Sequence, residues 1–280
     1  MNAKGLKRLL KSAVIYAVLI LLVLLTLLPL GWIISTSLKP SVEIFANPPY
    51  WIPKKITFGN YRNVFTASSI PIAFLNSLII ALLCSFMALL LGSMAGYAFA
   101  RFQFRGKSFL SLFMLLSQML PLTVLMIPLY YMENRAGLVD TKFGLACAHL
   151  VIALPLVTWM SKGYFKGLPH EIEEAALVDG CSVFQNLTRI VLPLLRPALA
   201  ATGIYAFISS WNEYALANVL TRSEVSRTVP LALNDFSTFF KVNWGDTMAA
   251  AVVITVPIII VFLSVQKQFI EGLASGAVKG

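Results

Sequence analysis

The sequence predicts an all-α integral membrane protein that crosses the bilayer six times. Of its 280 residues, 58% are hydrophobic and only 12% are charged, and the mean hydropathy is +0.80. Soluble domains carry about twice that share of charge. Several apolar runs reach the length of about 20 residues that a helix needs to cross the hydrocarbon. One polar, acidic segment lies between the fourth and fifth of these runs.

The spans follow from the apolar runs and from the polar or proline-rich stretches between them. A basic N-terminus, with positive charges up to Lys11, precedes a first run that is longer than the core of a signal peptide, about 7–15 residues. We therefore expect a retained first helix. Residues 35–70 are rich in proline and aromatic residues and predict an external loop. The expected spans are Ala13–Ile34, Pro71–Ala100, Phe109–Tyr131, Phe143–Met160, Pro197–Leu220 and Met248–Val265.

Three parts are expected along the chain. Residues 1–70 hold a cytoplasmic N-terminal segment, the first span and the external loop. Residues 71–265 form the core transmembrane domain, which includes the acidic segment at about residues 161–196. Residues 266–280 form a cytoplasmic C-terminal tail. In the second span, Gly92 and Gly96 make a GxxxG step, which allows close approach of another helix.

Basic residues set the expected orientation. Six spans place both termini on one side, and the short loop Arg101-Phe-Gln-Phe-Arg105-Gly-Lys107 lies on that same side. Because cytoplasmic loops carry excess Lys and Arg, both termini and the acidic segment are expected in the cytoplasm of a bacterial cell, with the chain in the inner membrane. The net charge of +10 is thus assigned to orientation and not to nucleic-acid binding. The three cysteines (Cys84, Cys147 and Cys181) show no metal-ligand spacing and are expected to be small buried residues.

The acidic segment predicts a helix, a glycine turn and a second helix. Pro169 suits an early helical position, and the helix dipole favours the glutamates of the first turns. Gly180 is a natural helix stop, and Ser182 with Gln185 matches a capping box. An amphipathic connector resting on the lipid headgroups is the alternative, although such helices are usually basic. One apolar face is expected from Val183, Phe184, Leu187, Ile190 and Val191.

The spacing of this segment also resembles that of a known family. The pattern Glu174-Ala-Ala-x3-Gly180-x9-Ile190-x-Leu192-Pro193 is similar to the EAA loop of bacterial ABC importer permeases, although Cys181 and Leu187 stand where that family more often has alanine and phenylalanine. The resemblance implies a type I ABC importer permease fold, with a coupling helix-turn-helix that sits in a cleft on a partner ATPase. It implies that Glu174 is the charged contact. The implied coupling residues are Glu174, Ala175, Ala176, Asp179, Gly180, Ile190, Leu192 and Pro193.

Other stretches resemble the carbohydrate branch of that family, specifically the maltose-type second permease. The resemblance implies a subunit that moves a sugar or sugar-like solute into the cell. It also implies a second permease subunit, two copies of a cytoplasmic ATP-binding subunit and an extracytoplasmic solute-binding protein; a homodimer of this chain stays open. The tail would reach the ATPase interface, and a frayed terminus is the alternative. The stretches are Ser37-Leu-Lys-Pro40, Asn60-Tyr61, Trp211-Asn-Glu213, Trp244-Gly245, Met248-Ala-Ala250 and Phe269 through Gly272-Leu273 to Gly280.

No cofactor is expected on this chain, and ATP and Mg are expected on the partner ATPase. Arg105-Gly-Lys107-Ser108 resembles the end of a phosphate loop, but Arg101 occupies the position of its first glycine. The spans contain no paired acids, metal-spaced histidines or nucleophile constellation. The chain is therefore predicted not to be an enzyme.

Three polar residues in or near spans are candidates for the translocation path: Gln118, Asn212 and Glu213. For Glu213, a structural tie to a neighbouring helix is the alternative, because a carboxylate in a span faces either a cavity or a partner. His149 is expected to be a packing residue. Two other classes remain as alternatives. An ion-coupled secondary transporter would show charges within several spans and an internal repeat, and a non-transporting membrane assembly protein would use the acidic segment only for binding.

Overall fold

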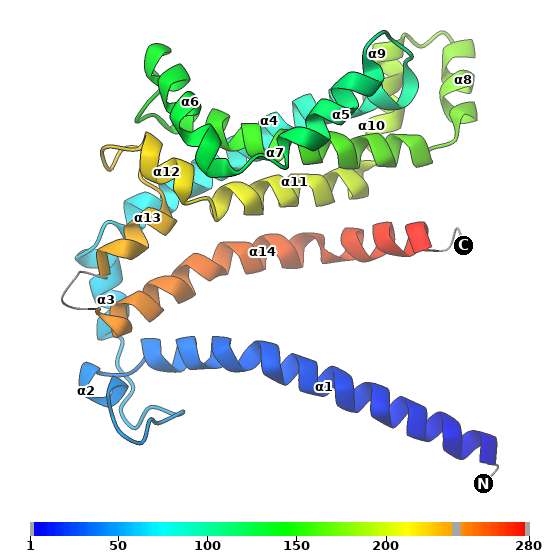
Figure 1. The fold of residues 1–280 in the computed structure, drawn as a ribbon. Coiled ribbons are helices and arrows are strands. Elements are labelled where there is room, and N and C mark those ends of the chain that lie inside the picture. The colour runs from blue at the N-terminus through cyan, green and yellow to red at the C-terminus, as the bar shows by residue number, and fades with distance from the viewer. Residues whose placement is uncertain (1–2, 237–241, 278–280) are drawn as a thin grey trace. The chain divides into compact units, whose positions relative to one another are not determined.

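All regular elements of the computed structural model are helices within the described backbone, residues 3–236 and 242–277 (Figure 1). Side chains are described for residues 11–236, 242–264 and 266. The chain divides into two units, Met1–Ser68 with Leu233–Thr255 and Ser69–Ala232 with Val256–Gly280. The last helix, α14 (Trp244–Ala277), contributes to both units.

Four single helices in the described part of the chain are long and apolar enough to cross a membrane. Two further pairs of shorter helices qualify together but bend sharply, by 106° and 83°. If each bent pair is one span, the count is six, as the sequence predicts. The four are Lys11–Ser37, Ile70–Arg101, Lys142–Gly167 and Trp244–Ser264, and the pairs are Lys107–Ser117 with Leu122–Arg135 and Val183–Leu194 with Arg196–Trp211.

In the first unit, a buried asparagine holds together three of the stretches that carry the family resemblance. The Asn60 amide donates hydrogen bonds to the carbonyls of Ser37 (2.8 Å) and Lys39 (2.9 Å). The hydroxyls of Ser37 and Tyr61 lie 2.8 Å apart. A Cβ on Gly245 would come within 2.6 Å of the Asn60 Oδ1 atom, so a larger residue there would displace the Asn60 amide from its position. The helices of this unit are α1 (Ala3–Ser37), α2 (Ser41–Ile44), α3 (Gly59–Thr66), η2 (Asn234–Phe236) and the start of α14.

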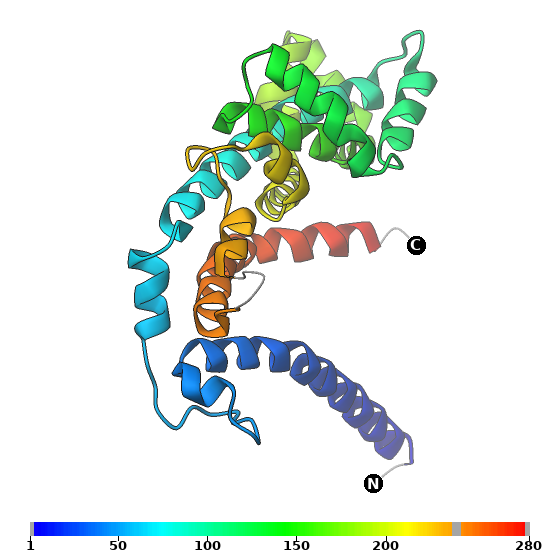
Figure 2. The same cartoon turned by 60° about the vertical axis from the view of Figure 1, so that its left-hand side comes forward.

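The second unit is built around three helices that run side by side, α4 (Ile70–Arg101), α7 (Lys142–Gly167) and α11 (Arg196–Trp211) (Figures 1 and 2). Small residues let α4 approach α7. A Cβ on Gly92 would meet Val157 Cγ1 at 2.6 Å, and one on Gly96 would meet the backbone nitrogen of Lys162 at 2.9 Å. The close approach predicted from the GxxxG step is confirmed. Among the cysteines, Cys84 is buried in this core, and Cys147 and Cys181 are half-buried.

The third predicted span is broken into α5 (Lys107–Ser117) and α6 (Leu122–Arg135), so a continuous helix over Phe109–Tyr131 is wrong. Pro121 takes an extended conformation immediately before α6. Proline has no N–H to donate and disfavours a helical residue before it, so the chain turns at this point. The second proline of the run, Pro128, is accommodated inside α6.

The fourth, fifth and sixth spans also differ from the expectation. Helix α11 ends at Trp211, and the chain resumes as α12 (Ala215–Leu220), so Asn212 and Glu213 lie at a break. Helix α7 continues to Gly167, past the predicted end at Met160. Helix α14 continues to Ala277 through most of the predicted tail, and residues 278–280 lie outside the described part of the chain. Helix α13 (Val229–Leu233) follows α12.

Asp140 ties the loop before α7 to the segment after α12. Its carboxylate accepts hydrogen bonds from the backbone of Arg222 (2.9 Å) and Ser223 (3.0 Å) and from the hydroxyls of Ser223 (2.6 Å) and Ser226 (2.9 Å). Partial burial alone would raise the pKa of Asp140, but these hydrogen bonds lower it to about 2. The residue has a φ of 64°, which aspartate tolerates better than most residues.

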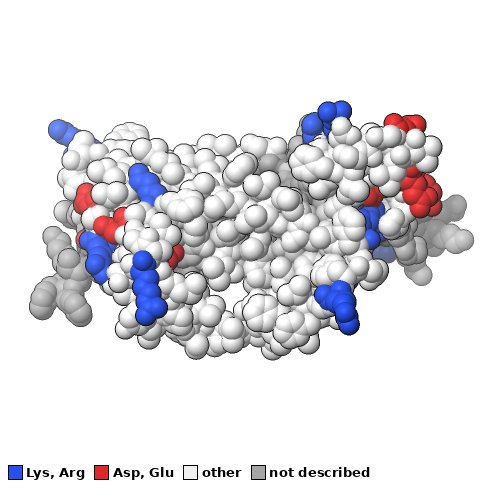
Figure 3. All heavy atoms as spheres, turned by 90° about the horizontal axis from the view of Figure 1, so that it is seen from above, with Lys and Arg blue, Asp and Glu red and all other residues white. Residues whose placement is uncertain are grey.

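Charge is kept away from the middle of the long helices in the second unit. Helix α4 has a single charged residue, Arg101, at its last position, and α7 carries lysines only at Lys142, Lys162 and Lys166. The face shown in Figure 3 has its charged side chains in two groups, separated by a broad band without charge. This distribution is what an apolar bilayer interior requires.

Candidate functional site

The acidic segment forms the predicted helix and glycine turn. Helix α8 (His170–Val178) follows Pro169, which occupies the N-cap in an extended conformation and not the first helical turn. As Figure 1 shows, α8 turns away from the end of α7. Gly180 has a φ of +85°, a left-handed backbone conformation that residues other than glycine adopt only with strain. The N–H of Cys181 closes the turn on the carbonyl of Ala176 at 3.0 Å.

The second helix begins with the predicted capping box. The Ser182 hydroxyl accepts from the Gln185 N–H (3.2 Å), and the Gln185 side chain accepts from the Ser182 N–H (2.9 Å). Both bonds satisfy backbone donors that the helix itself cannot pair. The elements that follow are α9 (Val183–Asn186), the π-helix η1 (Leu187–Val191) and α10 (Leu192–Leu194).

The single apolar face expected on this second helix is wrong. Leu187 and Val191 are buried against Tyr97 and Phe165, whereas Phe184 is 68% exposed. A π-helix has a wider turn than an α-helix and therefore shifts the residues that follow onto a different face. The five apolar residues are thus divided between an inner, packed side and an outer, open side.

A buried carboxylate anchors the segment to α4. Glu173 accepts hydrogen bonds from the Tyr97 hydroxyl (2.8 Å) and from Arg101 Nε (2.6 Å), with the Asn186 amide at 3.4 Å. Arg101 also donates to the carbonyl of Leu168 (2.9 Å). Both members of the Arg101–Glu173 ion pair are more than nine-tenths buried. Sequence reasoning missed this pair, because it used Arg101 as an orientation signal and as a departure from a phosphate loop, and assigned it no partner.

The outer side of the segment combines acidic and apolar side chains. Glu174, Ala175, Asp179 and Gly180 are exposed, and Val178 beside them is 87% exposed. Ala176 is buried, so only one of the two alanines lies on the outer side. Exposed apolar patches rimmed by polar groups are typical of interaction sites. We call this outer side, made of Glu174, Ala175, Leu177, Val178, Asp179, Gly180, Val183 and Phe184, the outer surface of the acidic segment.

The three C-terminal residues of the family pattern lie elsewhere. Ile190, Leu192 and Pro193 are half-buried, and Leu192 packs with the cluster of Tyr97 and Phe165. Leu192 is therefore on the inner side, and none of the three is fully exposed with the outer residues.

The candidate path residues are not brought together in one lining. Gln118 ends α5 and lines a groove between α5 and α7, and its amide donates to the carbonyl of Ile152 (3.1 Å). Asn212 is exposed at the end of α11. Glu213 caps α12 by accepting from the N–H groups of Leu216 (2.8 Å) and Ala217 (3.0 Å).

Glu213 also contacts His149, for which the sequence analysis named no partner. His149 Nε2 lies 3.2 Å from Glu213 Oε2, and His149 Nδ1 lies 2.7 Å from the Ser210 hydroxyl. His149 is buried, as expected of a packing residue, but it is also the partner of this carboxylate. These contacts favour the structural alternative for Glu213, a tie between α7 and the start of α12.

Comparison with known proteins agrees with this arrangement. Residues 88–274 match the family described as binding-protein-dependent transport system inner membrane component. The chain is 39% identical over 273 residues to the trehalose transport system permease protein SugB of Mycobacterium tuberculosis, covering 96% of this chain and 99% of the relative. It is 34% identical over 264 residues to the trehalose/maltose transport system permease protein MalG of Thermococcus litoralis, covering 93% and 94%.

A solved structure shares the fold. It is a bacterial ABC transporter involved in the import of the acidic polysaccharide alginate, with a TM-score of 0.79, 23% identity, and coverage of 95% of this chain and 98% of that one. The predicted type I permease fold is confirmed by this match and by the all-helical architecture. The chain therefore belongs to the family of binding-protein-dependent transport system inner membrane components, within the second-permease type of the carbohydrate ABC importers.

Proposed function

We propose that this permease carries a sugar or sugar-like solute into the cell, driven by a separate ATPase that binds the outer surface of the acidic segment. The observation that carries the coupling part is the contrast between two adjacent glutamates. Glu173 is buried and fixed to α4, whereas Glu174 is exposed next to uncovered apolar side chains. A rigid element with an open, mixed surface is suited to transmit the movement of a partner.

The chemistry of the outer surface indicates what the partner offers. Opposite Glu174 and Asp179 we expect a basic residue on the partner, because a carboxylate buried in an interface needs a charged partner. Opposite Val178 and Phe184 we expect an apolar cleft on the partner. Ala175 and Gly180 are small, so the partner can approach the segment closely there. ATP and Mg would bind to the ATPase and not to this chain.

The remaining partners and the orientation are part of the same proposal. The transporter would pair this chain with a second permease, two copies of the ATPase and an extracytoplasmic solute-binding protein. A solved relative is an alginate ABC transporter in complex with a periplasmic protein that holds an alginate pentasaccharide, which supports the last of these. Both termini and the acidic segment would lie in the cytoplasm.

The substrate class rests on relatives named for trehalose, maltose and diacetylchitobiose. That Gln118, Asn212 and Glu213 line the path stays a prediction.

Two substitutions on the outer surface test the coupling. Glu174→Lys reverses the exposed charge, and Gly180→Pro excludes the φ of +85° at the turn. Both variants should reach the membrane but fail to retain the ATPase on co-purification, and they should fail to take up whichever of radiolabelled trehalose, maltose and diacetylchitobiose the wild type transports. Glu224→Lys, on an exposed residue between α12 and α13, is the matched control and should behave like the wild type. Normal co-purification and uptake by both variants would refute the docking assignment.

A further inference from the structure

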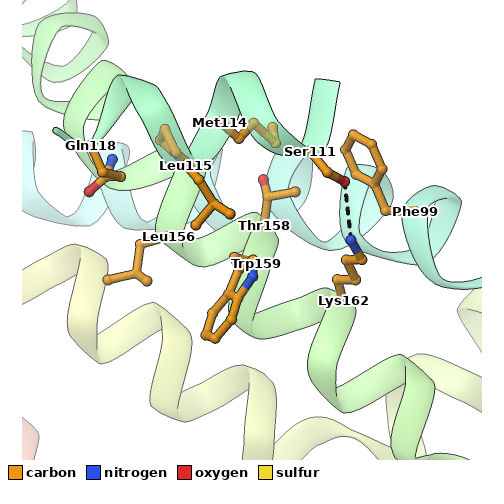
Figure 4. A pocket seen from close by; sticks show the side chains of 10 residues that line it. Phe99, Ser111, Met114, Leu115, Gln118, Leu156, Thr158, Trp159 and Lys162 are labelled. Atoms are coloured by element: carbon orange, nitrogen blue, oxygen red, sulfur yellow. Dashed lines mark hydrogen bonds between the residues drawn. The ribbon is translucent and has the colours of Figure 1, made fainter. Parts of the chain in front are cut away.

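A groove in the second unit is not used by the acidic segment. It lies between α5 and α7, holds about 240 Å³ and has Gln118 and Lys162 at opposite ends (Figure 4). Between them the walls are mainly apolar, with Met114 and Leu115 on α5 and Trp159 on α7.

The groove has the character of a site for a hydrocarbon chain. Its polar groups are few, and the Gln118 amide is already committed to the carbonyl of Ile152. A sugar placed there would lose its hydrogen bonds to water without replacing them, which is costly for each hydroxyl. A hydrocarbon chain loses nothing in this way and buries apolar surface.

Positive charge gathers at one end of the groove. Lys162 is half-buried there, with its Nζ 3.1 Å from the Ser111 hydroxyl and 5.5 Å from the centre of the Phe99 ring. Lys162 also lines an adjoining open hollow, of about 540 Å³, together with Lys166. Lys107, at the start of α5, acts on Lys162 electrostatically, as Lys166 does. Within the side chains that the structure describes, none of these three lysines forms an ion pair with a carboxylate.

We propose that this groove binds one anionic phospholipid, with an acyl chain between α5 and α7 and the phosphate on Lys162. Lys107 and Lys166 would surround the headgroup, since basic pockets between transmembrane helices are suited to anionic lipid headgroups. Trp159 is 57% exposed on the groove, and tryptophan favours the depth at which headgroups begin. The lysines lie near the end of α7 that leads into α8. That this end is cytoplasmic rests on the proposed function, whereas the preference for anionic lipid does not.

Trp159 provides the test, because brominated acyl chains quench tryptophan on contact. The purified transporter is reconstituted in phosphatidylcholine nanodiscs that contain an equal, small fraction of brominated phosphatidylglycerol or brominated phosphatidylcholine. Subtracting the signal of Trp159→Phe isolates Trp159 from all other tryptophans. We expect stronger, saturable quenching by phosphatidylglycerol. Its preference over phosphatidylcholine should fall about fivefold in Lys162→Gln, the effect of about one lysine near a headgroup.

Three controls separate the charge of Lys162, the position of the lysine and the headgroup phosphate as sources of the effect. Lys162→Arg should keep the preference, because it keeps the charge. Lys142→Gln, at the opposite end of α7, should leave it unchanged. Inorganic phosphate in the buffer should not relieve the quenching, because the acyl chain is part of the bound ligand. Equal quenching by both lipids, no quenching at all because a partner subunit covers the groove, or an unchanged preference in Lys162→Gln would overturn the proposal. No transport is needed for the measurement, so failure of the proposed function is a separate result.

Discussion

Removing the Glu173 carboxylate should release the acidic segment from α4. Glu173→Ala leaves the buried Arg101 guanidinium with the Leu168 carbonyl and the His170 ring as its remaining partners. Breaking a buried ion pair by removing one member costs about 3–5 kcal/mol, because the other charge stays desolvated. The population of the locally opened segment should therefore rise by roughly 150- to 5,000-fold.

Limited proteolysis measures this opening directly. Arg189 is exposed within the segment, and its peptide bond becomes a good trypsin substrate only when η1 unfolds. When reclosing is faster than cleavage, the cleavage rate follows the opened population. We expect cleavage after Arg189 in the detergent-purified permease to accelerate by roughly two to four orders of magnitude in Glu173→Ala.

The neighbouring glutamate is the matched control. Glu174 is exposed, so Glu174→Ala should change the opening free energy by less than about 0.5 kcal/mol and the cleavage rate by less than about threefold. Adding Arg101→Leu to Glu173→Ala should recover part of the loss, because it removes the unpaired charge. Equal cleavage rates in the two single variants would refute the reasoning.

Three further predictions concern other positions. Gly180→Ala should lower stability by about 1–2 kcal/mol because its φ is +85°, visible as a lower melting temperature in detergent; an unchanged melting temperature would contradict a rigid turn. Gly96→Val should sharply reduce the yield of folded protein on size-exclusion chromatography, because its Cβ would lie 2.9 Å from the backbone of α7. Gly163→Ala is the control and should keep the yield, because the space around Gly163 is open. The pKa of Asp140 is about 2 in the folded protein and about 3.9 when unfolded, so its contribution to stability is complete above about pH 4 and is lost as pH falls toward 2. The difference in melting temperature between wild type and Asp140→Asn should therefore shrink over that range, and a difference that stays constant would argue against the assigned cause.

The features that the sequence predicted well depend on nearby residues. Gly180 and the Ser182–Gln185 box act within a few positions of the chain, so their spacing alone indicates the turn and the cap. The apolar runs predicted the spans for the same reason. Gly92 and Gly96 indicated a close approach but not which helix would make it.

The features that were missed depend on contacts across the fold. Glu173 meets Tyr97 and Arg101, which lie more than 70 residues earlier, and no local pattern distinguishes it from the exposed Glu174. His149 and Glu213 are likewise distant along the chain.

The anchor at Glu173 also determines how far a small movement of the segment can be carried. Helix α4 has 32 residues, which at 1.5 Å each make a rod about 48 Å long. Glu173 binds this helix in its last turns, at Tyr97 and at the final residue, Arg101. A tilt of about 10° imposed there would displace the Ile70 end by about 8 Å, wider than a typical hexose ring. Through Glu173, a small tilt imposed at one end of α4 would become a displacement of molecular size at its other end.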